Sequence, residues 1–164
     1  MERKVVLGIG NILNSDEGLG VQALQALDAE FRESADVEFI DGGTLGLNLL
    51  DLVEECSHLL ILDAANTGRP PGTLIELARE EIPLFSGIKM SQHQLTFQEV
   101  LGLANIRDRL PGQLHFIGIQ PDCLEIGLDL SDTVKERLPD MIMAATRVLH
   151  RWGVLHATTD VAHQ

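Results

Sequence analysis

Several features that would place a protein in a particular class are missing from this sequence. No apolar run approaches the roughly 20 residues that a membrane-spanning helix needs, and the longest, around residues 59–62, has the length of a strand. The N-terminus leads directly into a predicted strand without a separate apolar segment and cleavage site. We therefore expect a cytoplasmic protein without a signal peptide and without a membrane as partner.

Cysteines and basic residues are both scarce. Cys56 and Cys123 lie far apart and form no CxxC pair, which suits a reducing compartment but leaves a disulfide open. The chain has 12 Lys and Arg against 25 Asp and Glu, a formal net charge of −13. This balance argues against nucleic acid as a partner, because that binding depends on basic side chains that neutralise phosphates. It favours a cation or a basic partner instead.

The common hydrolase motifs are also absent. The sequence contains no GxSxG and no HExxH, and neither cysteine has an obvious histidine partner. Asp16, Asp41 and Asp63 could supply the close carboxylate pair of a two-aspartate acid protease. Nothing else in the sequence supports that mechanism.

The most distinctive stretch that is present is GIGNILNSDEGLG, at residues 8–20. A short apolar run at residues 4–7 precedes it and predicts a buried strand. Apolar residues then recur at helical spacing, namely Val21, Leu24, Leu27 and Phe31. The stretch is therefore predicted to be a strand-to-helix turn that carries the adjacent carboxylates of Asp16 and Glu17. Because ligands of open parallel sheets bind where strands end and helices begin, this turn is a candidate site.

The rest of the chain predicts a single α/β domain. Further strands are expected at residues 37–40, 58–62, 73–77 and 114–119, and helices at about 45–53, 91–104 and 131–153. The connection at residues 66–72 is too short for a parallel crossover, so the fourth strand should run antiparallel at an edge or form a hairpin with the third. Pro139 should kink or break the last helix. We predict one three-layer domain over residues 1–164, with about five mostly parallel strands, helices on both faces and a frayed tail from about residue 154.

Three ionisable residues are predicted to lie where strands end or a helix begins. Glu17 follows the first strand, Asp63 ends the third, and the Ser91-x-x-Gln94 capping box puts His93 at the second position of a helix. Two carboxylates and one imidazole make a three-ligand metal site with open positions, as a catalytic site requires. These oxygen and nitrogen donors suit zinc, nickel or manganese better than copper(I) or an iron–sulfur cluster.

Each of the three also has a purely structural interpretation. Asn14-x-x-Glu17 has the spacing of a capping box, in which the helix dipole stabilises the carboxylate. Asp63 could begin the turn that follows its strand, and histidines at helix starts, such as His93, are commonly solvated. The residues alone leave both interpretations open.

A nucleotide site is a further alternative, which the charges disfavour. Gly-x-Gly at residues 8–10 follows a strand, and Asp41 ends the next one, as in a dinucleotide-binding fingerprint. The position of the third glycine, however, holds Leu13. The carboxylates at residues 16–17 would place two negative charges at the helix N-terminus, where a pyrophosphate should bind. We therefore predict no nucleotide site.

Several segments together resemble the nickel–iron hydrogenase maturation endopeptidases. They are GIGNILNSDEGLG at residues 8–20, DGGTLG at 41–46, ILDA at 61–64, His93, and GIQP at 118–121. The segments occur in matching order and span essentially the whole chain. The first of them is the most specific.

This resemblance implies a processing enzyme. Members of that family cleave a C-terminal extension from the precursor of the hydrogenase large subunit once nickel has been inserted. Their metal-binding positions match Glu17, Asp63 and His93, which would also carry catalysis. The segment Asp41, Gly42, Gly43, Thr44 matches one that contributes to selection of the cognate precursor.

The resemblance leaves the mechanism open. Nickel would be supplied largely by the precursor, and zinc or cadmium could occupy the site in vitro. Water near the cluster would be polarised by the metal or deprotonated by a carboxylate, and the family has been classed with both aspartic and metal-dependent peptidases. The alternative is a non-catalytic nickel-binding assembly factor that uses the same three residues. A monomer is the default expectation.

Overall fold

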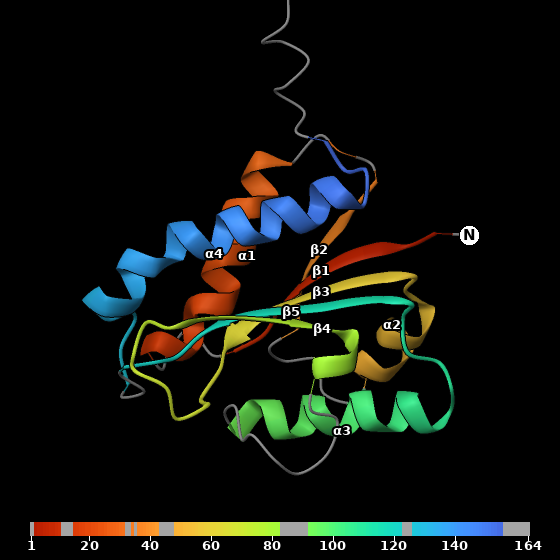
Figure 1. Cartoon of the computed structure of the whole chain (residues 1–164), viewed down its shortest axis with the longest axis horizontal. Coiled ribbons are helices and arrows are strands. Elements are labelled where there is room, and N and C mark those ends of the chain that lie inside the picture. The colour runs from red at the N-terminus through yellow and green to blue at the C-terminus, as the bar shows by residue number, and fades with distance from the viewer. Residues whose placement is uncertain are drawn as a thin grey trace, which may run out of the picture.

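Five strands form a single sheet in the order β2-β1-β3-β5-β4 in the computed structural model (Figure 1). They are β1 (Lys4–Gly8), β2 (Glu38–Asp41), β3 (His58–Ala64), β4 (Leu74–Ala78) and β5 (Gln113–Ile119). All run parallel except β4, which pairs antiparallel with β5. The structure describes residues 2–10, 15–31, 34, 36–42, 48–82, 92–122 and 126–155. The predicted sheet of five mostly parallel strands is confirmed.

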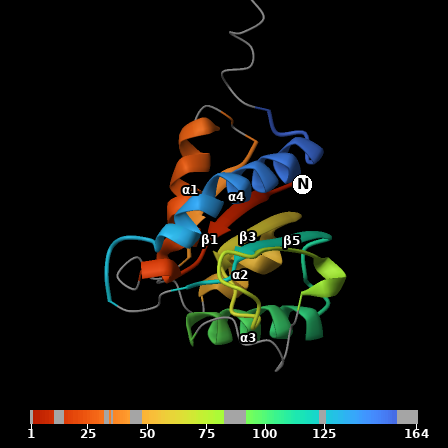
Figure 2. The ribbon, with the colours of Figure 1, turned by 60° about the vertical axis from the view of Figure 1, so that its left-hand side comes forward.

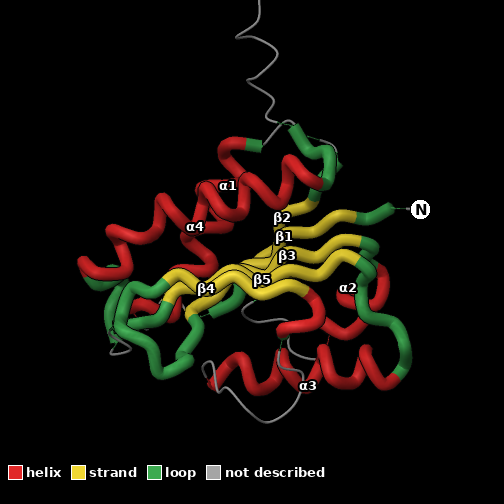
Figure 3. The backbone as a smooth tube through the Cα atoms, viewed as in Figure 1, coloured by secondary structure: helices red, strands yellow, loops and turns green. Residues whose placement is uncertain are grey.

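Helices cover both faces of this sheet, as Figure 2 and the tube in Figure 3 show. α1 (Leu19–Glu30) and α4 (Asp132–Arg151) lie on one face, and α2 (Asn48–Glu55) and α3 (Gln92–Ile106) on the other. Alternate residues of β3 enter the two cores: Leu60 and Leu62 pack with α1 and α4, whereas Leu59 and Ile61 pack with α2 and α3. This two-sided burial explains why the central strand is apolar almost throughout. The three-layer prediction is confirmed.

The position of β4 decides between the two alternatives left by the sequence. β4 lies at the edge of the sheet, antiparallel to β5, with Leu74 opposite Ile119 and Ala78 opposite His115. The edge prediction is therefore right and the hairpin with β3 is wrong. The reason is that β1 and β5 already pair with the two sides of β3. β4 instead occupies the outer side of β5, one of the two edges of the β2-β1-β3-β5 arrangement.

α4 runs without interruption through Pro139, so the predicted break is wrong. Pro139 is exposed, which lets water satisfy the carbonyl that loses its helical partner. The helix begins with Ser131 as N-cap, whose Oγ accepts the backbone N–H of Val134. It ends at Arg151, with Trp152 as C-cap. Gly153 follows with a φ of 85°, which favours glycine, and the N–H of Val154 closes the turn on the carbonyl of Leu149. Residues 156–164 lie outside the described part, so the frayed tail stays a prediction.

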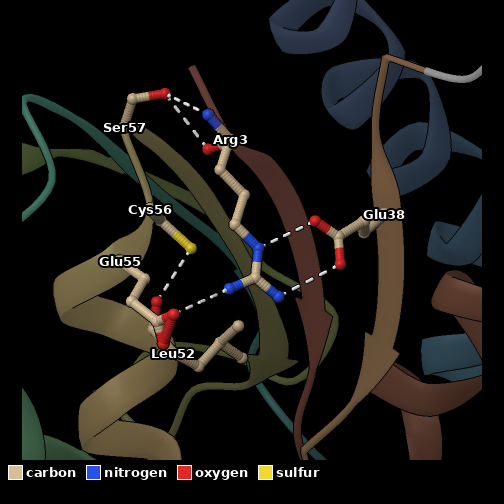
Figure 4. A network of polar contacts seen from close by, with 6 residues as sticks. All are labelled: Arg3, Glu38, Leu52, Glu55, Cys56 and Ser57. Carbon is tan, nitrogen blue, oxygen red and sulfur yellow. Dashed lines mark hydrogen bonds and ion pairs between the residues drawn. The ribbon is translucent and has the colours of Figure 1, made fainter. Parts of the chain in front are cut away.

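A polar cluster joins three elements at the amino ends of the strands (Figure 4). The guanidinium of Arg3 donates two hydrogen bonds to Glu38 of β2, at 2.8 and 3.1 Å, and lies 3.6 Å from Glu55 of α2. Its backbone N–H donates to Oγ of Ser57 at 2.9 Å. The hydrogen bond from Arg3 lowers the pKa of Glu38. We call these four residues the Arg3 clasp. They lie at the amino ends of the strands, whereas the candidate site lies at the carboxyl ends.

Cys56 is buried beside the Arg3 clasp. Burial raises the pKa of its thiol to about 11, and the thiol donates to the carbonyl of Leu52 at 3.0 Å. The protonated thiol is therefore its form at neutral pH, and Cys56 is not a nucleophile candidate. Cys123 lies outside the described residues. None of the described helices is long and apolar enough to span a membrane.

Candidate functional site

β1 and β3 are neighbours in the sheet, and the chain leaves their carboxyl ends in opposite directions along the strand order. From β1 the chain continues to β2 on one side, whereas β3 and β5 follow on the other. Gly8, the last residue of β1, pairs with Leu62, so Asp63 lies just beyond the end of β1. Ile9 stays attached there, because its N–H donates to the carbonyl of Leu62 at 3.0 Å. Open α/β sheets bind their ligands at such a point.

Of the three predicted metal ligands, Asp63 is the one that lies in a strand. It is only 1% exposed, and its Oδ1 accepts the backbone N–H of Ala64 at 2.7 Å. β3 continues through Ala64, so Asp63 is a strand residue and does not begin the following turn. A carboxyl group in this position is costly to bury, and its presence at the end of an apolar strand requires a compensating role.

Glu17 lies in the short 3₁₀ helix η1 (Ser15–Gly18), which contacts β3. α1 begins only at Leu19, and Gly18 caps it without a side-chain hydrogen bond. The purely structural interpretation, in which Glu17 lies in the first turn of that helix as part of a capping box, therefore does not agree with these bounds. Asn14, the other half of the predicted capping box, lies outside the described residues.

The glycine at position 20 explains how closely α1 approaches the strand ends. A Cβ added to Gly20 would lie 2.3 Å from the carbonyl oxygen of Leu62 and 2.5 Å from that of Ile9. No side chain fits there, because real Cβ atoms essentially never approach other atoms within 3.0 Å. The glycine-rich stretch thus lets the helix after η1 rest directly on the backbone that leads to Asp63.

His93 is the second residue of α3, as its predicted capping box requires. The helix is anchored by Phe97, Val100 and Leu101, which are buried against the sheet. α3 begins on the side of the molecule where the parallel strands end, at the left in Figure 1. Ser91 and the side chain of His93 lie outside the described part.

Of the three predicted metal ligands, only Asp63 has a described side chain. Among the side chains that the structure describes, no group of three His, Cys, Asp or Glu could hold a metal ion. The side chains of Glu17 and His93 are not among them. The combination of Glu17, Asp63 and His93 therefore stays a prediction.

The segment proposed to select the substrate begins at the same sheet edge. Asp41 is the last residue of β2 and is exposed. Gly42 follows it and donates its N–H to the carbonyl of Gly8 at 2.8 Å, which ties this segment to the start of the glycine-rich stretch. Gly43 and Thr44 lie outside the described residues, so the role of the whole segment stays a prediction.

Two polar residues at this edge have roles that the sequence did not indicate. Asp16 is fully buried and is hydrogen-bonded to Asp122 and Ser131. Gln120, directly after β5, accepts the N–H of Thr67 at 2.8 Å and so holds the loop that follows β3. Ser131 was predicted only as the first residue of the last helix, and no local pattern links it to Asp16, because 115 residues separate the two.

Comparison with known proteins agrees with this arrangement. The model of the hydrogenase maturation protease family matches residues 21–148. The chain belongs to this family. As a hydrogenase maturation protease it is a hydrolase, and the resemblance drawn from its motifs is confirmed.

Curated relatives and a solved structure match nearly the whole of this hydrogenase maturation protease. The hydrogenase expression/formation protein HupD of Rhizobium leguminosarum bv. viciae is 44% identical over 154 residues, which are 93% of this chain and 76% of that protein. The hydrogenase 2 maturation protease of Escherichia coli K12 is 34% identical over 98% of this chain and 99% of that protein. The structure of the hydrogenase maturating endopeptidase HybD from E. coli aligns with a TM-score of 0.81 and 34% identity, over 92% of this chain and 94% of that one.

Proposed function

We propose that this hydrogenase maturation protease removes the C-terminal extension of a nickel–iron hydrogenase large-subunit precursor after nickel has been inserted. The observation that carries the proposal is the buried carboxyl group of Asp63 at the point where the sheet connections diverge. The family match provides the reaction class. The E. coli relative is named as the maturation protease of hydrogenase 2, which supports a hydrogenase subunit as substrate.

Nickel enters this proposal as part of the substrate. Glu17, Asp63 and His93 would complete the coordination of nickel that the precursor already holds, so that only loaded precursor docks productively. Two carboxylates and an imidazole are a donor set that suits a divalent ion such as nickel, with zinc or cadmium as substitutes in vitro. His93 at the start of α3 would be favoured in its neutral, metal-binding form by the positive end of the helix dipole.

Cleavage is a hydrolysis in which water adds to the scissile carbonyl carbon and the peptide C–N bond breaks. A proton passes from the water to the leaving amine. A carboxylate of the cluster would act as general base if it accepts this proton. Alternatively, nickel held by the precursor would activate the water by polarising it. The exposed Asp41 and the glycines after it would contact the precursor beside the site.

The deciding experiment is mass spectrometry of the large-subunit precursor after incubation with this protein, with and without nickel loaded. We expect only the loaded precursor to lose its C-terminal peptide. If both forms stay intact while the proteins still bind each other, the chain is instead a non-catalytic nickel-binding assembly factor.

Single substitutions in the same assay test the three candidate residues. Glu17→Gln, Asp63→Asn and His93→Ala should each abolish processing of loaded precursor. Glu99→Gln on α3 and Asp140→Asn on α4 are matched controls, because both residues are exposed and lie outside the site. Loss of processing in the controls as well would show that the assay reports general damage and would remove the support for the three residues.

A further inference from the structure

Asp16 has no part in the proposed chemistry, yet it is one of the most completely buried polar residues of the described chain, at 0% exposure. Its Oδ1 accepts the backbone N–H of Ser131 at 2.7 Å. Its Oδ2 accepts the backbone N–H of Asp122 at 2.8 Å and the hydroxyl of Ser131 at 2.9 Å. Such hydrogen bonds to a carboxylate are strong and offset the cost of burying it. A buried group with this many donors holds its surroundings in one arrangement.

The partners of Asp16 belong to distant parts of the chain. Asp122 follows β5 and Ser131 precedes α4, 106 and 115 residues away from Asp16. Ser131 is also the N-cap of α4, so its hydroxyl donates to Asp16 while its oxygen accepts the N–H of Val134 at 3.3 Å. α4 is 20 residues long and is packed into the core along its length. Asp16 thereby attaches the turn η1 to the longest described helix of the molecule.

The turn itself has a conformation that requires external support. Ser15, its first residue, has a φ of 50°, in the left-handed region that residues other than glycine rarely adopt. Such residues persist where the surrounding structure holds them, and they are frequent at functional sites. The N–H of Ser15 donates to the carbonyl of Gly127 at 2.9 Å, in the segment just before Ser131. The segment at residues 126–131 therefore restrains η1 on one side, and β3 contacts it on the other.

We propose that Asp16 is the positioning residue of the site: it fixes the backbone of η1, and with it that of Glu17, relative to Asp63 at the end of β3. This inference rests on the proposed function of Glu17. Glu17 is the next residue in the same four-residue turn, so a shift of η1 displaces its backbone directly. A displacement of about 1 Å at a reacting group can lower the rate by about 100-fold.

The test measures kcat and KM for cleavage of nickel-loaded precursor. Asp16→Asn keeps one acceptor oxygen but turns an NH2 group toward the donors of Asp122 or Ser131. We expect kcat to fall by about 10- to 100-fold, and KM to rise as well, because Glu17 takes part both in the cleavage step and in docking through nickel of the precursor. Ser131→Ala removes the hydroxyl contact with Asp16 and the N-cap contact with Val134 but leaves the two backbone N–H donors of Asp16, and it should lower kcat less. Ser131→Thr keeps the hydroxyl, and its kcat should equal that of the wild type.

Arg3→Ala is the matched control for general destabilisation. It removes a polar cluster of comparable size at the amino ends of the strands, and kcat measured well below its melting temperature should not change. If Arg3→Ala lowers kcat as much as Asp16→Asn at an equal loss of melting temperature, the positioning role is overturned. It is also overturned if Asp16→Asn keeps both kcat and kcat/KM within about two-fold of the wild-type values.

The wild-type protein and Glu17→Gln are assayed in parallel. If the wild type does not process the precursor, the proposed function and the positioning role fall together. If the wild type is active and Glu17→Gln is not, normal kcat and kcat/KM values in Asp16→Asn overturn the positioning role alone. Should Asp16→Asn fail to fold, the positioning role is tested by comparing kcat of Ser131→Ala with that of Ser131→Thr, because only the second keeps the hydroxyl that donates to Asp16. Equal kcat values for the two variants would overturn the role.

Discussion

At the scale of single residues, Asp63 combines two properties that oppose each other energetically. It carries an ionisable group, and it is 1% exposed at the end of an otherwise apolar strand. Proteins retain such residues where they act on a ligand, and functional groups of this kind often lower stability in exchange for activity. An amide oxygen at this position could also accept the N–H of Ala64.

The substitution Asp63→Asn separates these two properties. We expect cleavage of the loaded precursor to fall by at least about 100-fold, the effect of losing a general base or a metal ligand. We expect the free energy of unfolding to stay the same or to rise, because an ionisable group leaves the interior. Mass spectrometry of the precursor gives the first quantity, and urea unfolding followed by the fluorescence of the single tryptophan gives the second. Full activity of Asp63→Asn would contradict its assignment to the site.

At the scale of elements, the site depends on how closely α1 lies on the ends of β1 and β3. Gly20 in the first turn of α1 permits this approach, since the carbonyls of Leu62 and Ile9 occupy the space of a side chain. Opening that contact would therefore shift α1, and η1 directly before it, relative to β3. The same region contains Glu17 and Asp63, so a packing change here is also a change of the site.

Gly20→Ala should therefore destabilise the protein and reduce its activity. An added Cβ 2.3 Å from a backbone carbonyl forces α1 away from β3, and overpacking of this kind costs about 1–3 kcal/mol of unfolding free energy. Gly112→Ala is the matched control, because a Cβ at that position meets nothing within 4 Å. It should be neutral or slightly stabilising. Urea unfolding of both variants measures the difference, and equal stability of the two would refute the close contact.

At the scale of the whole molecule, two half-buried histidines make stability depend on pH. His58 and His115 both lie beside Trp152, with ring centroids 5.1 and 6.1 Å from the indole. Burial lowers the pKa of both histidines below the ordinary value of 6.5. The folded state therefore binds fewer protons than the unfolded state in this range. Their contribution to stability is present above about pH 6.5 and is lost as the pH falls through the lowered pKa values.

We expect the free energy of unfolding to decrease between pH 7.5 and about pH 5.5 for this reason. The substitution His115→Gln removes one of the two titrating groups and should flatten that decrease. Urea unfolding at several pH values, followed by the fluorescence of Trp152, measures both curves. A wild-type curve that is flat over this range would show that the two histidines titrate alike in the folded and unfolded states.

A second prediction at this scale concerns nickel. If the precursor supplies most of the ligands, this protein by itself holds only part of a coordination sphere and should bind nickel weakly. Equilibrium dialysis of the isolated protein against nickel measures this affinity. Tight binding of one nickel per chain would show that the protein carries a complete site of its own, and would contradict recognition through nickel of the precursor.

What the sequence by itself determined was the order of elements and the positions of the three candidate residues. Apolar runs and helical periodicity are local signals, and each can be read within a few residues. The same signals put Glu17, Asp63 and His93 at the ends of elements. The family motifs then supplied the function, because they are short and specific.

Only the tertiary structure decided which distant groups meet. β4 pairs with β5 because β3 has no free side, which depends on the whole sheet. Pro139 is tolerated because it faces water, and Asp16 is a buried anchor because residues 106 and 115 positions away supply its donors. Burial and hydrogen bonding between remote segments arise only when the chain is packed. A local pattern specifies what a residue could do, and its surroundings in the fold determine what it does.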